Sequence, residues 1–148
     1  MLVSYGADWC VWCHVFKKYV SGEVDRFEYD FDGQSFTMRE KAQDPDAAVR
    51  EAAAVAAFVR ENFVLVHIEG DDAPGGSQLL DAVGALERFE SYYPYVFVVD
   101  QDGYFVQAYN YKAVEIRRNG LTDYFRGYDR SILLDQLTHM REAALAAE

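Results

Sequence analysis

The chain has only two cysteines among its 148 residues, and few basic residues. A structural disulfide framework would need more cysteines, and a zinc site of four protein ligands would need a second cysteine pair or other ligands. The 14 Lys and Arg stand against 25 Asp and Glu, which gives a formal charge of −11. This balance argues against nucleic acid or an anionic membrane surface as a partner.

Long apolar runs are also missing. No stretch approaches the roughly 20 apolar residues of a transmembrane helix, and no signal peptide precedes Leu2. We recognise no internal repeat, low-complexity linker, glycine-rich phosphate loop or Ser/His/Asp arrangement. The length suits one domain with a core of its own, so we expect a single domain over residues 1–148.

What the chain does have is a compact motif at its start, ADWCVWCH at positions 7–14. An apolar stretch at 2–5 precedes it and a helix-compatible stretch at 15–20 follows, which predicts a strand-to-helix junction. The unpaired N–H groups and the dipole of a helix start would stabilise a thiolate at Cys10 and lower its pKa. Cys13 lies one turn further on the same face, where it can attack a mixed disulfide on Cys10.

The segment ADWCVWC at 7–13, continuing to Phe16 and Lys18-Tyr19, resembles the thioredoxin superfamily. It is most similar to the C-terminal thioredoxin-like domain of the bacterial thiol:disulfide interchange protein DsbD and its single-domain relatives. The resemblance implies an α/β thioredoxin fold, with a central mixed sheet flanked by helices. Two stretches, about 25–50 and 111–126, exceed that pattern and are interpreted as insertions.

The elements expected from periodicity and capping follow the same order. Strands are predicted at 2–5, 63–68, 96–99 and 104–109, the third and fourth joined by a turn at 102–103. The first helix should run to about Val20, and Asp44, Ser77 and Asp129 are expected to cap the later ones. Hairpins are predicted at 27–38, around Asp32 and Gly33, and at 114–125, the latter extending the sheet. The segment 69–76 reads as a loop, and His67 as a core or edge histidine with a backbone partner.

A proline after an aromatic residue stands at the head of the third predicted strand. Such a position fits a cis peptide bond between Tyr93 and Pro94. By the resemblance, Pro94 matches the cis-proline that faces the disulfide in thioredoxin-like proteins. Tyr93, Pro94, Trp9 and Trp12 are then the predicted substrate-binding residues.

Two positions depart from the family pattern. Ser4 stands six residues before Cys10, where thioredoxins commonly carry a buried acid that helps proton transfer. His14 follows Cys13, where Lys or Arg is common, and a protonated His14 would favour the thiolate, so we assign it a pKa-tuning role. Lys17 and Lys18 are expected to be solvated.

These observations predict a thiol–disulfide oxidoreductase, with Cys10 as the exposed nucleophile and Cys13 as the resolving thiol. The resemblance favours a reductase that works without a cofactor or metal. Its partners would be protein thiols and disulfides or a redox partner protein. We expect the protein to be a monomer. The resemblance favours the bacterial periplasm or cell envelope as its location.

Several alternatives stay open. The chain could be a non-catalytic thioredoxin-fold binding module with a redox-sensitive cysteine pair. The run Cys10 to His14 also satisfies the c-type haem attachment pattern. Two further hypotheses remain. The cysteines could be buried and inert, or both thiols could combine with His14 in a metal site.

Overall fold

The computed structural model describes residues 1–31, 33–70 and 74–147, and it confirms the predicted order of elements. Asp32, Asp71 and Asp72, which belong to predicted turns and loops, lie outside the described residues. The elements are β1 (Leu2–Gly6), α1 (Val11–Val20), β2 (Arg26–Phe31), β3 (Gln34–Arg39), α2 (Pro45–Asn62), β4 (Leu65–Glu69), α3 (Gly76–Ala82), the 3₁₀ helix η1 (Leu86–Arg88), β5 (Tyr95–Val99), β6 (Phe105–Ala108), α4 (Tyr111–Val114), β7 (Glu115–Asn119), β8 (Tyr124–Tyr128) and α5 (Arg130–Ala146).

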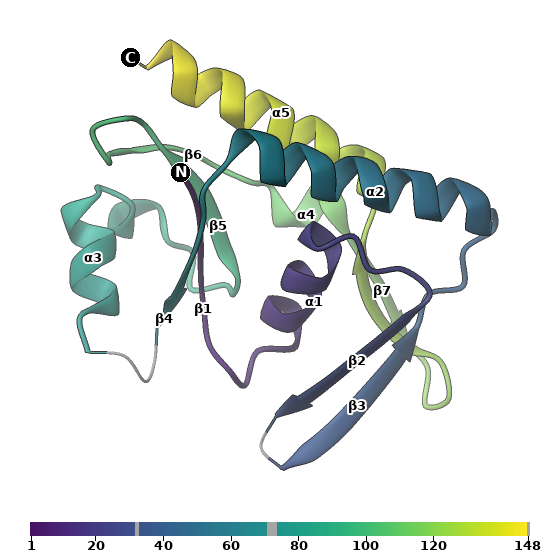
Figure 1. The fold of residues 1–148 in the computed structure, drawn as a ribbon. Coiled ribbons are helices and arrows are strands. Elements are labelled where there is room, and N and C mark those ends of the chain that lie inside the picture. Colours follow the sequence, from purple (N-terminus) through teal and green to yellow (C-terminus); the bar gives the residue numbers. More distant parts are fainter. Residues whose placement is uncertain (32, 71–73, 148) are drawn as a thin grey trace.

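A mixed sheet in the order β4-β1-β5-β6 forms the centre of the molecule. Strand β1 runs parallel to β4 and antiparallel to β5, and β5 runs antiparallel to β6. Helix α3 lies on one side of this sheet, and α1, α2 and α5 lie on the other (Figure 1). The predicted α/β class, a mixed sheet flanked by helices, is therefore confirmed.

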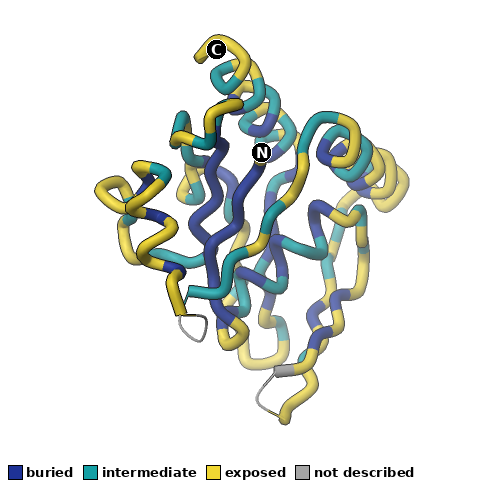
Figure 2. The backbone as a smooth tube through the Cα atoms, turned by 60° about the vertical axis from the view of Figure 1, so that its left-hand side comes forward, coloured by how far each residue is buried: buried dark blue, intermediate teal, exposed yellow. Residues whose placement is uncertain are grey.

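The alternation of side chains along the central strands builds two apolar layers. Leu2, Val96 and Val98 pack with α1, α2 and α5, whereas Val3 and Tyr5 face the side of α3. Successive residues of a strand point to opposite faces, so strands buried on both faces read as continuous apolar runs. The two inner strands of the sheet, β1 and β5, are buried at every position, as Figure 2 shows.

Helix starts follow the predicted caps in two of three cases. The Asp44 side chain accepts from the Ala47 N–H, and the Asp129 side chain accepts from the Ile132 N–H, each at 3.1 Å. The prediction for Ser77 was wrong, because α3 begins at Gly76, two residues before the predicted start, and Gly75 is its N-cap, in the left-handed region at φ 95°.

Four further expectations about burial and pairing need correction. Strand β4 is parallel as predicted, but it is an edge strand, with Leu65 41% exposed. Helical periodicity predicts that the second helix buries Val49, Ala52, Ala53, Ala56 and Val59, but Val49 is exposed and the buried face is rotated from the predicted one. It also predicts one buried stripe along the third helix, made of Leu79, Leu80, Val83, Leu86 and Phe89, but α3 ends at Ala82 and Leu79 and Leu86 are exposed. Leu145 of α5 is largely exposed. The residues that α2 does bury are Ala48, Ala52, Val55 and Val59.

The two inserted stretches form hairpins of their own. Strands β2 and β3 pair as predicted, and Phe27, Tyr29 and Met38 join the main core. Strands β7 and β8 also pair, but as a separate two-stranded sheet that does not extend the central one. Among the described residues, no helix combines the length and apolarity needed to cross a membrane.

Candidate active site at the start of α1

Cys10 occupies the N-cap of α1, directly after the loop that leaves β1. Its backbone is extended, with φ −84° and ψ 111°, and its N–H donates to the Ala7 carbonyl at 3.1 Å. Its Sγ accepts a hydrogen bond from the Cys13 backbone N–H at 3.1 Å. The sulfur therefore takes the place of the oxygen in an ordinary N-cap, and it satisfies one of the unpaired N–H groups of the helix start.

The pKa values of the two thiols are shifted in opposite directions. The pKa of Cys10 lies below its ordinary value, mainly because the Cys13 thiol donates a hydrogen bond to it, with further help from backbone N–H groups; burial opposes this. The pKa of Cys13 is raised far above its ordinary value, because that thiol donates to Cys10 and is buried. The charge of Lys17 acts in the opposite direction on Cys13. Lys17 and Lys18, which we expected to be solvated, are both half-buried. Cys10 is therefore the better nucleophile of the pair.

Cys10 is less exposed than we predicted for the nucleophile. It is 5% exposed and Cys13 is 2% exposed, because the aromatic residues around them cover most of the sulfur surface. Cys10 nevertheless lines an open hollow of about 390 Å³. The hollow is lined by Trp9, Cys10, Val11, Trp12, Ser91, Tyr92 and Tyr93. Access to the first thiol is thus from this side, and Cys13 lies behind it.

Three of the four predicted substrate-binding residues, Trp9, Trp12 and Tyr93, line the hollow, and Pro94 does not. Trp9 is 56% exposed, and its ring packs against Tyr93 with centroids 5.6 Å apart. Trp12 and Tyr93 pack against the cluster of Ala7, Cys10 and Cys13. The predicted cis peptide bond between Tyr93 and Pro94 is present. Pro94 is buried and lines a second cavity of about 380 Å³, which shares Tyr92 with the hollow.

His14 is held by the loop that leads to Cys10. Its Nε2 donates to the Asp8 carbonyl at 2.7 Å, and its ring stacks on Tyr29 with centroids 5.4 Å apart. The imidazole therefore ties α1 to the preceding loop and to β2. The predicted pKa-tuning role stays a prediction.

A buried carboxylate beside the hollow was not expected from the sequence. The side chain of Glu115 is 4% exposed, and it accepts from Tyr92 Oη at 2.6 Å and from Arg117 Nη2 at 2.6 Å. Arg117 also lies over the Trp12 ring, 5.2 Å from its centroid. The negative charge of Glu115 acts to raise the pKa of Cys10. No sequence signal could have found this cluster, because Tyr92 and Glu115 are 23 positions apart.

Gly6 leaves the space that Cys13 occupies. A Cβ on Gly6 would lie 2.5 Å from Cys13 Sγ, closer than real contacts allow. The end of β1 and the second thiol are thus packed against each other, which fixes where α1 sits over the sheet.

Metal or haem ligation finds little support in the donor set. Within the ranges 1–31, 33–70 and 74–147, no three His, Cys, Asp or Glu side chains are grouped to hold a metal ion. Nε2 of His14, the atom that would reach a haem iron, is bonded to the Asp8 carbonyl instead.

Comparison with protein-family models, with curated proteins and with solved structures finds no match to this chain.

Proposed function

We propose that the protein is a thiol–disulfide oxidoreductase with a thioredoxin-type fold, acting on protein disulfides through Cys10 and Cys13. The observation that carries this proposal is the hydrogen bond from the Cys13 N–H to Cys10 Sγ at the start of α1. Such a bond favours the thiolate, the form of cysteine that reacts. The sheet order β4-β1-β5-β6, with α1 following the first strand, supports the proposed fold.

The exchange proceeds in two substitutions at sulfur. The Cys10 thiolate attacks one sulfur of a substrate disulfide, forms a mixed disulfide and releases the other sulfur as a thiolate. Cys13, after losing its proton, attacks Cys10 Sγ and forms the Cys10–Cys13 bond. The second substrate sulfur then leaves, so the substrate gains two electrons and the protein pair loses two.

The walls of the hollow suit a polypeptide substrate. Trp9 and Tyr93 present rigid aromatic surface beside Cys10, and such side chains bind apolar neighbours of a disulfide at low entropic cost. The formal charge of −11 favours basic or neutral partners. By the resemblance, we further propose electron delivery, that is, a reductase, in the periplasm or cell envelope.

Insulin reduction with dithiothreitol as electron donor tests the proposal. We expect the wild-type protein to accelerate precipitation of the insulin B chain, and Cys10→Ser to fall to the uncatalysed rate. Cys13→Ser, incubated with insulin in the absence of dithiothreitol, should still attack insulin and accumulate a mixed disulfide, visible as added mass. A wild-type protein that leaves the rate unchanged would contradict the proposal.

A second candidate is a binding module in which the two thiols act only as a redox-sensitive clasp. The observation that favours it is the 5% exposure of Cys10 beside an exposed aromatic surface. The same assay separates the two candidates, because a binding module is inactive with and without Cys10.

A further inference from the structure

The second exchange step needs a group that removes the proton from Cys13. Its thiol is 2% exposed, and burial, which does not depend on the charge of Cys10, raises its pKa. Only the thiolate attacks a disulfide, so at neutral pH a nearby base would speed this step. Ser4 is buried and lies two residues before Gly6 on β1. It cannot serve as this base, since a serine hydroxyl does not titrate in this pH range.

His67 of β4 lies on the same side of the sheet as Cys13. The β1–β4 register pairs Ser4 with His67, so their side chains share a face. Around Gly6, the position that a Cβ would take lies 2.5 Å from Cys13 Sγ and 3.7 Å from His67 Cε1. Cys13 Sγ and His67 Cε1 therefore lie within about 6 Å of each other, across a residue without a side chain. One water molecule can bridge such a separation.

The surroundings of Cys13 and His67 include a buried polar side chain, and they reach solvent at His67. Ser4 Oγ is buried, and no hydrogen-bond partner for it lies among the described residues. His67 itself is exposed on the edge strand, so a proton that it accepts can pass to solvent. The charged and titratable groups that act on the imidazole are Lys17 and His14 of α1 and Asp8 of the preceding loop.

These surroundings keep the imidazole in its basic form. His67 is exposed as a whole residue, but partial desolvation of its ring and the charge of Lys17 lower its pKa. Asp8 and a backbone hydrogen bond with Ser4 act in the opposite direction. The net effect is a pKa below the ordinary value of 6.5, so the ring is neutral and able to accept a proton at pH 7.

We propose that His67 accepts the proton of the Cys13 thiol when Cys13 attacks the mixed disulfide on Cys10; this rests on the proposed function. The S–H proton of Cys13 moves to the imidazole through one water molecule. The thiolate then forms the Cys10–Cys13 bond and breaks the bond between Cys10 and the substrate sulfur, which leaves as a thiolate. The imidazolium gives its proton to solvent.

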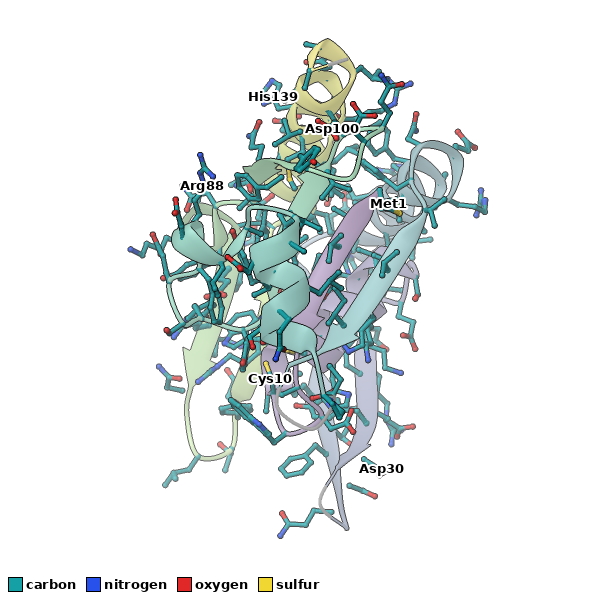
Figure 3. All side chains as sticks on the ribbon, turned by 90° about the vertical axis from the view of Figure 1, so that its left-hand side faces the viewer. Met1, Cys10, Asp30, Arg88, Asp100 and His139 are labelled. Carbon is teal, nitrogen blue, oxygen red and sulfur yellow. The ribbon has the colours of Figure 1, made fainter. Side chains whose placement is uncertain are left out.

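The two steps can be timed separately with 5,5′-dithiobis(2-nitrobenzoate) in a stopped-flow spectrometer. Attack by Cys10 on this disulfide releases one equivalent of coloured thionitrobenzoate, at a rate that depends on reagent concentration. Attack by Cys13 releases the second equivalent at a rate that does not. We compare wild type with His67→Gln, and with His139→Gln as the matched control, since His139 is on α5 and well away from Cys10 (Figure 3).

His67→Gln is expected to leave the first phase within twofold of wild type and to slow the second at least about tenfold at pH 7. The second phase of wild type should rise with pH through the pKa of His67 and then level off. In His67→Gln this inflection should be absent. His139→Gln should behave as wild type.

An unchanged second phase in His67→Gln, or slowing of both phases by one factor, would overturn the proposal. Failure of the proposed function looks different: the wild-type protein would leave the rate of insulin reduction unchanged, whatever phases it shows with this reagent.

Discussion

The backbone N–H of Cys13 points at the sulfur of Cys10 from 3.1 Å, so the second cysteine of the motif acts on the first through both its main chain and its thiol. The main-chain contribution survives any substitution at position 13 except proline, whereas the thiol contribution does not. Substitutions at Cys13 can therefore separate the two.

Removal of the Cys13 thiol should make Cys10 less reactive. In Cys13→Ala we expect the rate of Cys10 alkylation by iodoacetamide at pH 7 to fall roughly three- to tenfold, because a hydrogen bond to a charged group contributes about 1.5–3 kcal/mol and a more basic thiolate partly offsets this. Cys13→Ser keeps a donor and should lose less. Equal rates in wild type and Cys13→Ala would show that the thiol of Cys13 does not stabilise the Cys10 thiolate.

Neutralising the buried carboxylate should have the opposite effect. Glu115→Gln keeps an acceptor for Tyr92 but removes the charge that raises the pKa of Cys10, so that pKa should fall. Stabilising the thiolate stabilises the reduced pair, and its potential should become less negative. We expect faster Cys10 alkylation at pH 6, by about two- to fivefold. Glu142→Gln, which removes the same charge from α5, is the control, and a slower Glu115→Gln would refute the assignment.

A methyl group at Gly6 should disturb both the fold and the thiol pair. Its carbon would lie 2.5 Å from Cys13 Sγ and 3.3 Å from Cys13 Cβ, so the side chain has to move. Such overpacking costs about 1–3 kcal/mol, and we expect the free energy of unfolding, measured with urea, to fall by this amount. The second thionitrobenzoate phase should also be slower. At Gly120 the nearest atoms are 3.5 Å away, so Gly120→Ala should change neither measurement. Similar behaviour of the two variants would argue against the packing described for Gly6.

A buried ion pair should hold the first hairpin to the helices. Arg130 at the start of α5 pairs with Glu40, which follows β3, and its guanidinium also donates to the Glu23 carbonyl at 3.1 Å. The Arg130 side chain is 3% exposed, so Glu40→Ala leaves a buried charge without its partner. We expect the free energy of unfolding of Glu40→Ala, measured with urea, to be about 3–5 kcal/mol lower than that of wild type.

The exposed pair of Arg26 and Glu28 provides the matched comparison. Both side chains are more than half exposed, and Glu28→Ala should cost about 0–1 kcal/mol. If Glu40→Ala cost no more than Glu28→Ala, the pair would not be holding the hairpin in place.

Local signals in the sequence predicted the parts of the molecule that depend on local chemistry. The spacing of Cys10 and Cys13 and the caps Asp44 and Asp129 act within one helical turn, so they could be recognised without the fold. The pairing of β2 with β3 likewise follows from alternation around a short turn.

The missed features depend on contacts between distant segments. The exposure of β4 follows from its place at the sheet edge, and an apolar run does not reveal that place. The position of Glu115 beside Tyr92, and that of His67 beside Gly6, join residues from different elements. The low exposure of Cys10 has the same origin, because Tyr93 comes from a segment about 80 positions away.

A redox titration of the Cys10–Cys13 pair tests the central claim most directly. The protein is equilibrated with glutathione at fixed ratios of reduced to oxidised form, and free thiols are counted by alkylation and mass. We predict a single two-electron transition to an intramolecular disulfide, with a midpoint near the value of thioredoxin, about −270 mV, as expected for a reductase. A midpoint near about −120 mV would instead indicate an oxidant. Two separate glutathione adducts, or no Cys10–Cys13 disulfide at any ratio, would contradict the account.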